Sequence, residues 1–189
     1  MIADGSIDQL QRDVQEQAIR MIAMRQPMAH DLRHAVSVLK LAAELERIGD
    51  LAKNIALRAM TISGAEQPRT ILVGLEHMTE LAGRQLKDVL DAWSARDGKK
   101  ALGVWRGDAG LDALYNSVFR DLLARMMEDP RDIEHSTHLL FVAKNLERIG
   151  DHTTNIAEQI LYLITGVTSP RDRIKGDDTS TFSTQETAT

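Results

Sequence analysis

The stretch LERIGDLAKNIA at residues 45–56 returns as LERIGDHTTNIA at residues 146–157, an offset of 101 residues. Nine of the twelve positions are identical, which indicates an internal repeat of one structural unit. Each copy carries two carboxylates four residues apart, Glu46 with Asp50 and Glu147 with Asp151. We therefore expect the unit to perform the same task twice in one chain.

The apolar residues around both copies recur in alternating steps of three and four, which is typical of helices in a bundle. The first run extends from Val38 to Ile55, and its copy extends from Leu139 to Leu163. No alternation typical of strands accompanies a hairpin turn signal anywhere in the chain. The sequence therefore predicts an all-α fold with five long antiparallel helices, at residues 4–25, 27–61, 68–96, 101–128 and 131–164.

The repeat also predicts how the chain is divided. We place the first repeat at residues 1–63, the second at 64–166, and a disordered tail poor in apolar residues at 167–189. Only 49 residues precede Asp50, so the first repeat is shorter at its start by about 35 residues, or one long helix. We expect a tandem repeat of three-helix bundles whose first member lacks its N-terminal helix. A shortened start is the preferred explanation, and a partner chain that fills the groove is the alternative.

Composition narrows the classes of function. The 189 residues are 43% apolar and 27% charged, contain no Cys, and carry a net charge of −5. A metal would therefore need oxygen or imidazole ligands, because no thiolate is available. The chain has neither a basic block nor an apolar run long enough to cross a bilayer. We expect a cytoplasmic protein that binds no nucleic acid and does not insert into the membrane.

A second pair of acidic residues precedes each copy of the motif. Asp4 with Asp8, and Asp108 with Asp112, are also four residues apart. In an antiparallel hairpin, residues equidistant from the turn lie side by side. The midpoint between the acidic residues of the two helices is Pro27 in the first hairpin and position 129.5 in the second. Four carboxylates should then share one level of each hairpin. We name them the first acidic site (Asp4, Asp8, Glu46 and Asp50) and the second acidic site (Asp108, Asp112, Glu147 and Asp151).

Helix geometry predicts that these carboxylates point outward, because Glu46 and Asp50 lie roughly 160° from the apolar stripe of their helix. Clustered carboxylates repel one another unless protons, arginines or cations compensate. Hard oxygen ligands suit Mg, Ca, Mn or Fe, with Zn also feasible. The alternative is an ordinary solvated surface on which Arg47 and Arg148 neutralise the acids. Recurrence in both repeats gives metal binding the same standing as this alternative.

Other residues provide weaker signals. His34 and His135 match at the same offset, but an Asp three residues before each fits the start of a helix. The chain has no Glu-x-x-His sequence, no phosphate-binding Gly loop and no nucleophile motif, so a catalytic role has little support. Gly49 and Gly150 interrupt helices, where Gly costs about 1 kcal/mol. They predict close helix packing or room beside the carboxylates.

Two segments carry a resemblance to a known family. IDQLQRDVQEQAIRMIAMRQPMAHDLR, followed by ELERIGDLAKNIA, and the later LDALYNSVFRDLLARMMEDPRDIEHSTHLLFVAKNLERIGDHTTNIAE resemble the PhoU family over about residues 2–163. The resemblance implies two three-helix bundles whose E/D-x-x-x-D motifs bind multinuclear metal clusters on the surface. Carried over, the ligands are the eight carboxylates of the two acidic sites.

The same resemblance implies a regulator and not an enzyme. PhoU-like proteins lie at the cytoplasmic side of the phosphate ABC transporter and communicate its state to a sensor histidine kinase. We therefore expect negative regulation of phosphate uptake and of the phosphate-starvation response, with the transporter ATPase subunit, the kinase and a second copy of the chain as partners. The bound metal would be Fe, Mn, Mg or Zn. A metal-handling helical bundle and a purely structural helical adaptor are the alternatives, and a metal-assisted enzyme follows them.

Overall fold

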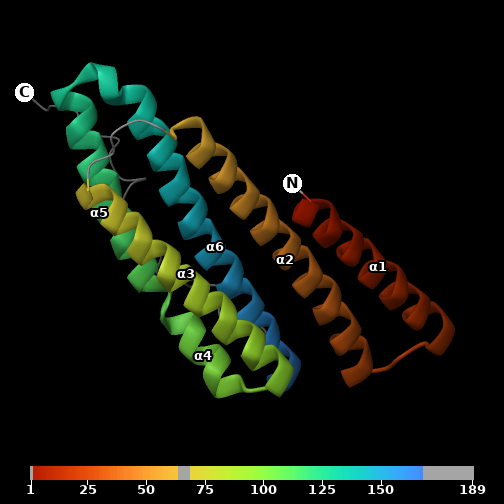
Figure 1. Cartoon of the computed structure of the whole chain (residues 1–189). Coiled ribbons are helices and arrows are strands. Elements are labelled where there is room, and N and C mark those ends of the chain that lie inside the picture. Colours follow the sequence, from red (N-terminus) through yellow and green to blue (C-terminus); the bar gives the residue numbers. More distant parts are fainter. Residues whose placement is uncertain (1, 64–68, 168–189) are drawn as a thin grey trace, which may run out of the picture.

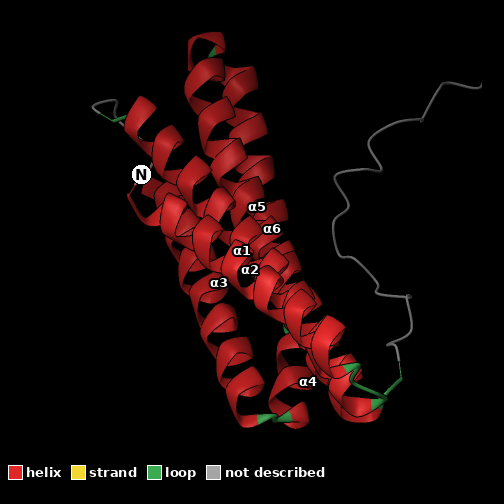
Figure 2. Cartoon of the chain, turned by 90° about the vertical axis from the view of Figure 1, so that its right-hand side faces the viewer, coloured by secondary structure: helices red, strands yellow, loops and turns green. Residues whose placement is uncertain are grey.

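The computed structural model describes residues 2–63 and 69–167, with side chains from residue 5 onward. Every regular element in this part of the chain is helical, and Figure 2 shows it in one view. The elements are α1 (Ile2–Arg25), α2 (His30–Thr61), α3 (Arg69–Ala95), α4 (Gly98–Arg106), α5 (Asp108–Glu128), a 3₁₀ turn η1 (Pro130–Asp132) and α6 (Ile133–Thr165).

The all-α prediction is confirmed, but the single helix predicted at 101–128 is wrong. The chain forms two helices there, α4 and α5, which meet at Gly107. The carbonyl of Gly107 accepts a hydrogen bond of 3.1 Å from the side-chain amide of Gln85, so a neighbouring helix provides a partner at the break. α4 also starts earlier than predicted, because the Asp97 side chain accepts from the backbone N–H groups of Lys99 and Lys100.

The turns lie close to the predicted positions. Asp129 caps the turn at Pro130 by accepting a hydrogen bond of 3.0 Å from the backbone N–H of Arg131. The second helix begins at His30 and not at Pro27, since Gln26 and Ala29 adopt positive φ angles of 43° and 48° between the two helices. A residue before proline is disfavoured in helical geometry, which ends α1 at this point.

Helix α6 lies at the centre of the molecule. It packs extensively against α2, α3, α4 and α5, whereas α1 packs extensively against α2 alone. Figure 1 shows this order, with α1 at the edge, α2 beside it, and α3, α4 and α5 grouped around α6. α2 and α6 run antiparallel, since Arg33 near the start of α2 meets Gly166 at the end of α6, and Arg58 lies over the ring of Phe141.

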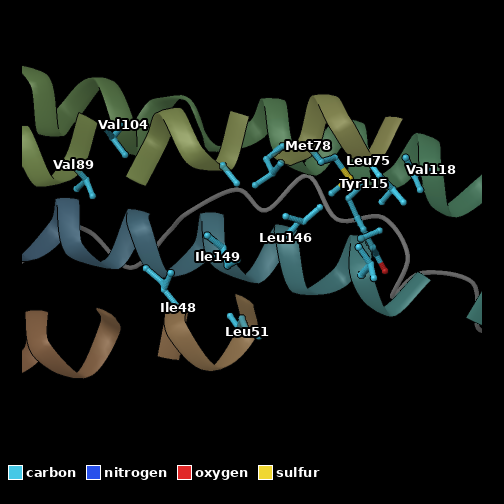
Figure 3. Close-up of a cluster of buried hydrophobic side chains, with 14 of the residues drawn as sticks. Ile48, Leu51, Leu75, Met78, Val89, Val104, Tyr115, Val118, Leu146 and Ile149 are labelled. Carbon is cyan, nitrogen blue, oxygen red and sulfur yellow. The ribbon is translucent and has the colours of Figure 1, made fainter. Parts of the chain in front are cut away.

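One hydrophobic core joins helices α2 to α6. Figure 3 shows Ile48 and Leu51 of α2 below α6, and Leu75, Met78 and Val118 above it. The apolar stripe of α3 is buried at Ile71, Leu75, Met78, Ala82 and Val89. Because α2 and α6 contribute to the same cluster, the two repeats share packing. The division at residues 63 and 64 stays a prediction.

Helices α1 and α2 leave an apolar groove of about 460 Å³ between them. Its lining is Ile7, Leu10, Gln11, Val14, Ala42, Leu45, Ile48, Gly49 and Ala52, with Leu86 of α3 at its edge. In the second repeat α3 packs on both α5 and α6, whereas the hairpin of α1 and α2 has no third helix of this kind among the described residues. The missing first helix of the first repeat stays a prediction.

Two further predictions concern the ends of the chain and the membrane. The tail expected at 167–189 lies, beyond Val167, outside the described residues. Within the described part, no helix combines the length and apolarity that crossing a bilayer requires.

Candidate metal centre

The second acidic site is built where α5 and α6 pack together. Asp108 occupies the first turn of α5 and Asp112 the next turn, so both side chains leave the same face of that helix. Asp108 accepts a hydrogen bond of 3.2 Å from the hydroxyl of Thr154, one turn beyond Asp151 on α6. This contact centres the hairpin on residue 131 instead of the predicted 129.5, so Asp108 contacts a residue three positions beyond Asp151, its predicted partner.

The carboxylates of the second acidic site are enclosed, contrary to the predicted outward direction. Asp108, Asp112 and Glu147 are 6%, 4% and 3% exposed, and Asp151 is half-buried. The outward direction predicted from the angles around a single helix is wrong here, because α2, α3, α4 and α5 pack against several sides of α6. A position opposite the main apolar stripe of such a helix still faces a neighbouring helix.

Burial perturbs the ionisation of Glu147. Desolvation raises its pKa, Lys144 opposes the rise through an ion pair of 3.1 Å, and the negative charges of Asp151 and Asp112 add to it. Atom Oε2 of Glu147 is buried and has no hydrogen-bond partner. The dependence on both Asp151 and Asp112 shows that carboxylates from the two helices of this hairpin interact. Lys144, and not Arg148, forms the ion pair with Glu147.

The first acidic site has the same register but a more open environment. Ile7 of α1 lies against Gly49 of α2, which centres this hairpin on residue 28, one residue from the predicted Pro27. Asp8 and Glu46 are half-buried and Asp50 is exposed. The side chain of Asp4 lies outside the described part of the structure.

The two motif glycines perform the predicted packing role. A methyl group on Gly49 would stand 3.1 Å from the Cδ1 atom of Ile7, and one on Gly150 would overlap the Cδ2 atom of Leu111. Ile7 and Leu111 each directly precede an acidic residue, Asp8 and Asp112. Each glycine therefore allows the preceding helix to approach closely beside the carboxylates.

The described side chains do not form a closed coordination shell. Among them, no three Asp, Glu or His groups lie close enough together to hold one ion. The assignment of the eight carboxylates as metal ligands therefore stays a prediction. The chemistry of the second acidic site nevertheless suits a cation, because its groups are carboxylates, three of the four are buried, and one carboxylate oxygen of Glu147 has no hydrogen-bond donor.

One contact beside this site could not be inferred from the sequence pattern. Glu44 of α2 accepts a hydrogen bond of 3.2 Å from Asn155, and its Oε2 atom lies 2.6 Å from Nδ1 of His152. Burial raises the pKa of Glu44, but the hydrogen bonds from His152 and Asn155 outweigh it and the pKa is lowered. The repeat concealed this contact, because the positions equivalent to Glu44 and His152 are Asn145 and Leu51.

Comparisons with known proteins agree with this arrangement. A family model described as "PhoU domain" matches residues 2–59 and 75–160, and each segment contains one LERIGD motif. The "Phosphate-specific transport system accessory protein PhoU homolog" of Rhizobium meliloti is 51% identical over 183 residues, which cover 96% of this chain and 77% of the relative. The protein of the same name from Caulobacter vibrioides is 51% identical over 173 residues, which cover 90% of this chain and 75% of the relative.

Solved structures of this family share the fold. The crystal structure of PhoU from Pseudomonas aeruginosa superposes with a TM-score of 0.83 at 39% identity, covering 87% of this chain and 78% of that one. The crystal structure of the phosphate transport system regulatory protein PhoU from Streptococcus pneumoniae superposes with a TM-score of 0.81 at 28% identity. The match covers 88% of this chain and 78% of that one. The repeated motif, the helical bundle, the matching family model and these relatives together show that the chain belongs to the PhoU family.

Proposed function

We propose that this chain is a cytoplasmic negative regulator of phosphate uptake and of the phosphate-starvation response, acting without catalysis. The observation that carries the proposal is the enclosed second acidic site in a chain whose relatives are phosphate-specific transport accessory proteins. Its residues Asp108, Asp112, Glu147 and Asp151 would hold a hard cation such as Mg, Mn or Fe, or Zn. The bound cation would neutralise the buried carboxylates and fix α5 against α6.

The partners follow from the family resemblance. They are the ATPase subunit of the phosphate ABC transporter, a sensor histidine kinase, and a second copy of this chain in a homodimer. The apolar groove between α1 and α2 supports a protein contact on that side, because contiguous exposed apolar surface marks interaction sites. In this proposal the second acidic site determines the rigidity of the central hairpin, while the surfaces of the bundle meet the partners.

The test measures signalling and metal content together. In a strain that lacks its own copy, the wild-type chain should lower expression from a phosphate-starvation promoter in excess phosphate. The double variant E147Q/D151N should leave expression high and purify with less metal, although circular dichroism shows it folded. E46Q/D50N, the same change in the first acidic site, is the matched control and should retain most of the repression.

Other outcomes would assign the chain to a different class. Full repression by E147Q/D151N after loss of its metal would contradict the proposal and favour a structural adaptor. A deletion strain with altered metal content and unchanged promoter activity would favour a metal-handling bundle.

A further inference from the structure

The hairpin of α1 and α2 is attached to the other helices mainly through one interface. Helix α1 packs extensively against α2 alone, and α2 packs extensively against α1 and α6. Figure 1 shows the same arrangement, with α1 and α2 on one side of α6. Parts of a chain that meet in this way move relative to each other unless their interface is large and hydrophobic. The composition of the α2–α6 interface therefore determines whether the first hairpin can move.

The stripe of α6 that faces α2 is largely polar. Its position follows from three residues that contact α2, because Phe141 lies under Arg58, and His152 and Asn155 lie beside Glu44. Alternating steps of three and four residues connect these positions on one helix face. The stripe consists of Phe141, Asn145, Arg148, His152, Asn155 and Gln159. Apart from its first residue, every side chain in it is polar.

Helix α2 presents a similar stripe. Arg33 meets Gly166, while Glu44 and Arg58 make the contacts named above. The same steps extend these positions to Arg33, Ser37, Lys40, Glu44, Arg47, Leu51, Asn54 and Arg58. The fully buried Ser37 has a hydroxyl without a hydrogen-bond partner, and so has the Oε1 atom of Gln159 on α6. These unpaired atoms reduce the advantage of the observed position over others.

Glu44 has alternative donors along α6. In the observed position its Oε2 atom lies 2.6 Å from Nδ1 of His152 and accepts from Asn155 at 3.2 Å. Arg148 lies one turn before His152 on the same stripe, and Gln159 lies one turn after Asn155. A displacement of one turn, about 5.4 Å, would bring Glu44 level with Arg148 and His152. This direction is favoured over the one toward Gln159, because a guanidinium forms the stronger bond with a carboxylate.

We propose that the α2–α6 interface is a sliding joint between the two repeats, and that Glu44 holds it in the observed position through His152 and Asn155. In the displaced position Glu44 pairs with Arg148. Sliding of packed helices is an established form of conformational change, and donors spaced one turn apart give it two discrete positions. This inference does not depend on the metal-binding role proposed above.

Distances between two spin labels test the joint, since the chain contains no Cys and labels attach only where one is introduced. Q15C on α1 and S117C on α5 replace exposed residues on the two sides of the interface. Double electron–electron resonance should give one dominant distance in this otherwise wild-type chain. H152L/N155A should raise the ratio of displaced to observed molecules by about tenfold or more, because Glu44 loses both partners. The second distance should differ by up to about 5 Å.

The matched control is N54A, the same change at the repeat counterpart of Asn155. Asn54 is exposed, so N54A should keep the single distance. Adding R148A to H152L/N155A should remove the second distance. An unchanged single distance in H152L/N155A would overturn the inference, as would a second distance that appears equally in N54A or persists with R148A.

A cross-link decides the matter if H152L/N155A does not fold. Under mild oxidation the pair E44C/R148C should form a disulfide, which requires the two Cα atoms to come within about 7 Å. The observed position keeps these residues more than one turn apart along the interface, so the bond reports the displaced position. Absence of the disulfide in the folded chain would contradict the inference.

Discussion

The acidic residues of the two LERIGD copies lie at equivalent places in their hairpins but in different surroundings. Glu147 on α6 is 3% exposed, whereas Glu46 on α2 is half-buried. The apolar stripe behaves in the same way, since Thr153 is fully buried and its counterpart Ala52 is exposed beside the open groove. The motif therefore supplies the carboxylates, and the neighbouring helices determine whether they lie in water or in a low-dielectric interior.

Metal affinity should show the largest difference between the two sites. We expect E147Q/D151N to weaken the tightest Mn²⁺ binding by roughly 100-fold, because two proposed ligands of an enclosed site are lost. E46Q/D50N should change that tightest step by less than about threefold, since its carboxylates are more hydrated. Isothermal titration calorimetry measures both. An equal loss in the two variants would show that enclosure makes no difference to affinity.

The two motif glycines give the next largest contrast. G150A should lower the free energy of unfolding by about 1–2 kcal/mol, because its methyl group overlaps the fully buried Leu111. G49A meets only the end of the partly buried Ile7 side chain at 3.1 Å, and gains up to about 1 kcal/mol of helix propensity. Urea unfolding of both variants without metal tests the contrast. A stable G150A would mean that Leu111 moves aside readily.

Burial of Glu147 predicts a pH-dependent effect of removing its charge. Its raised pKa means that the folded chain holds this proton more tightly than the unfolded chain does, so the ionised form destabilises the fold at neutral pH. Without metal, E147Q should be more stable than the wild type by about 1 kcal/mol, or about 2–4 °C in midpoint. The advantage should disappear as the pH falls below the ordinary glutamate pKa.

The matched variant for this measurement is E46Q. It should change the thermal midpoint by less than about 1 °C across the same pH range, since the charge of the half-buried Glu46 is more hydrated than that of Glu147. A wild type more stable than E147Q at neutral pH would show that the ion pair with Lys144 outweighs the desolvation of the carboxylate.

The smallest effect is expected where the two hairpins differ in chemistry, at the contact between Glu44 and His152. H152L gives this position the residue of its repeat counterpart, Leu51, and should lower stability by about 0.5–1 kcal/mol through loss of one hydrogen bond. Because the pKa of Glu44 is lowered in the fold, its contribution is present above the ordinary glutamate pKa and is lost as the pH falls through the lowered value. Thermal melts over a falling pH series measure the difference, and a difference that does not shrink below the ordinary glutamate pKa would contradict this explanation.

Most of the helices and both turns could be predicted from the sequence, because each depends on local spacing. Steps of three and four give the helices, and symmetry about Pro27 and position 129.5 gives the register. The enclosure of Glu147 could not be predicted from its own helix, since it depends on how many helices pack against α6. The break at Gly107 depends in part on a side chain of another helix, Gln85.

The contact of Gln85 with Gly107 could not be found by comparing the repeats. Each acidic residue was identified because the other repeat provides an equivalent. Gln85 belongs to α3, the helix that has no counterpart among the described elements of the first repeat. An internal repeat therefore reveals what its copies share, and it conceals a residue that only one copy contains.

Anomalous diffraction from crystals of this chain loaded with Mn²⁺ tests most directly whether enclosure makes the second acidic site the better metal centre. We predict a strong peak among Asp108, Asp112, Glu147 and Asp151, and a weaker one or none beside Asp8, Glu46 and Asp50. A strong peak at the first acidic site with none at the second would contradict the account.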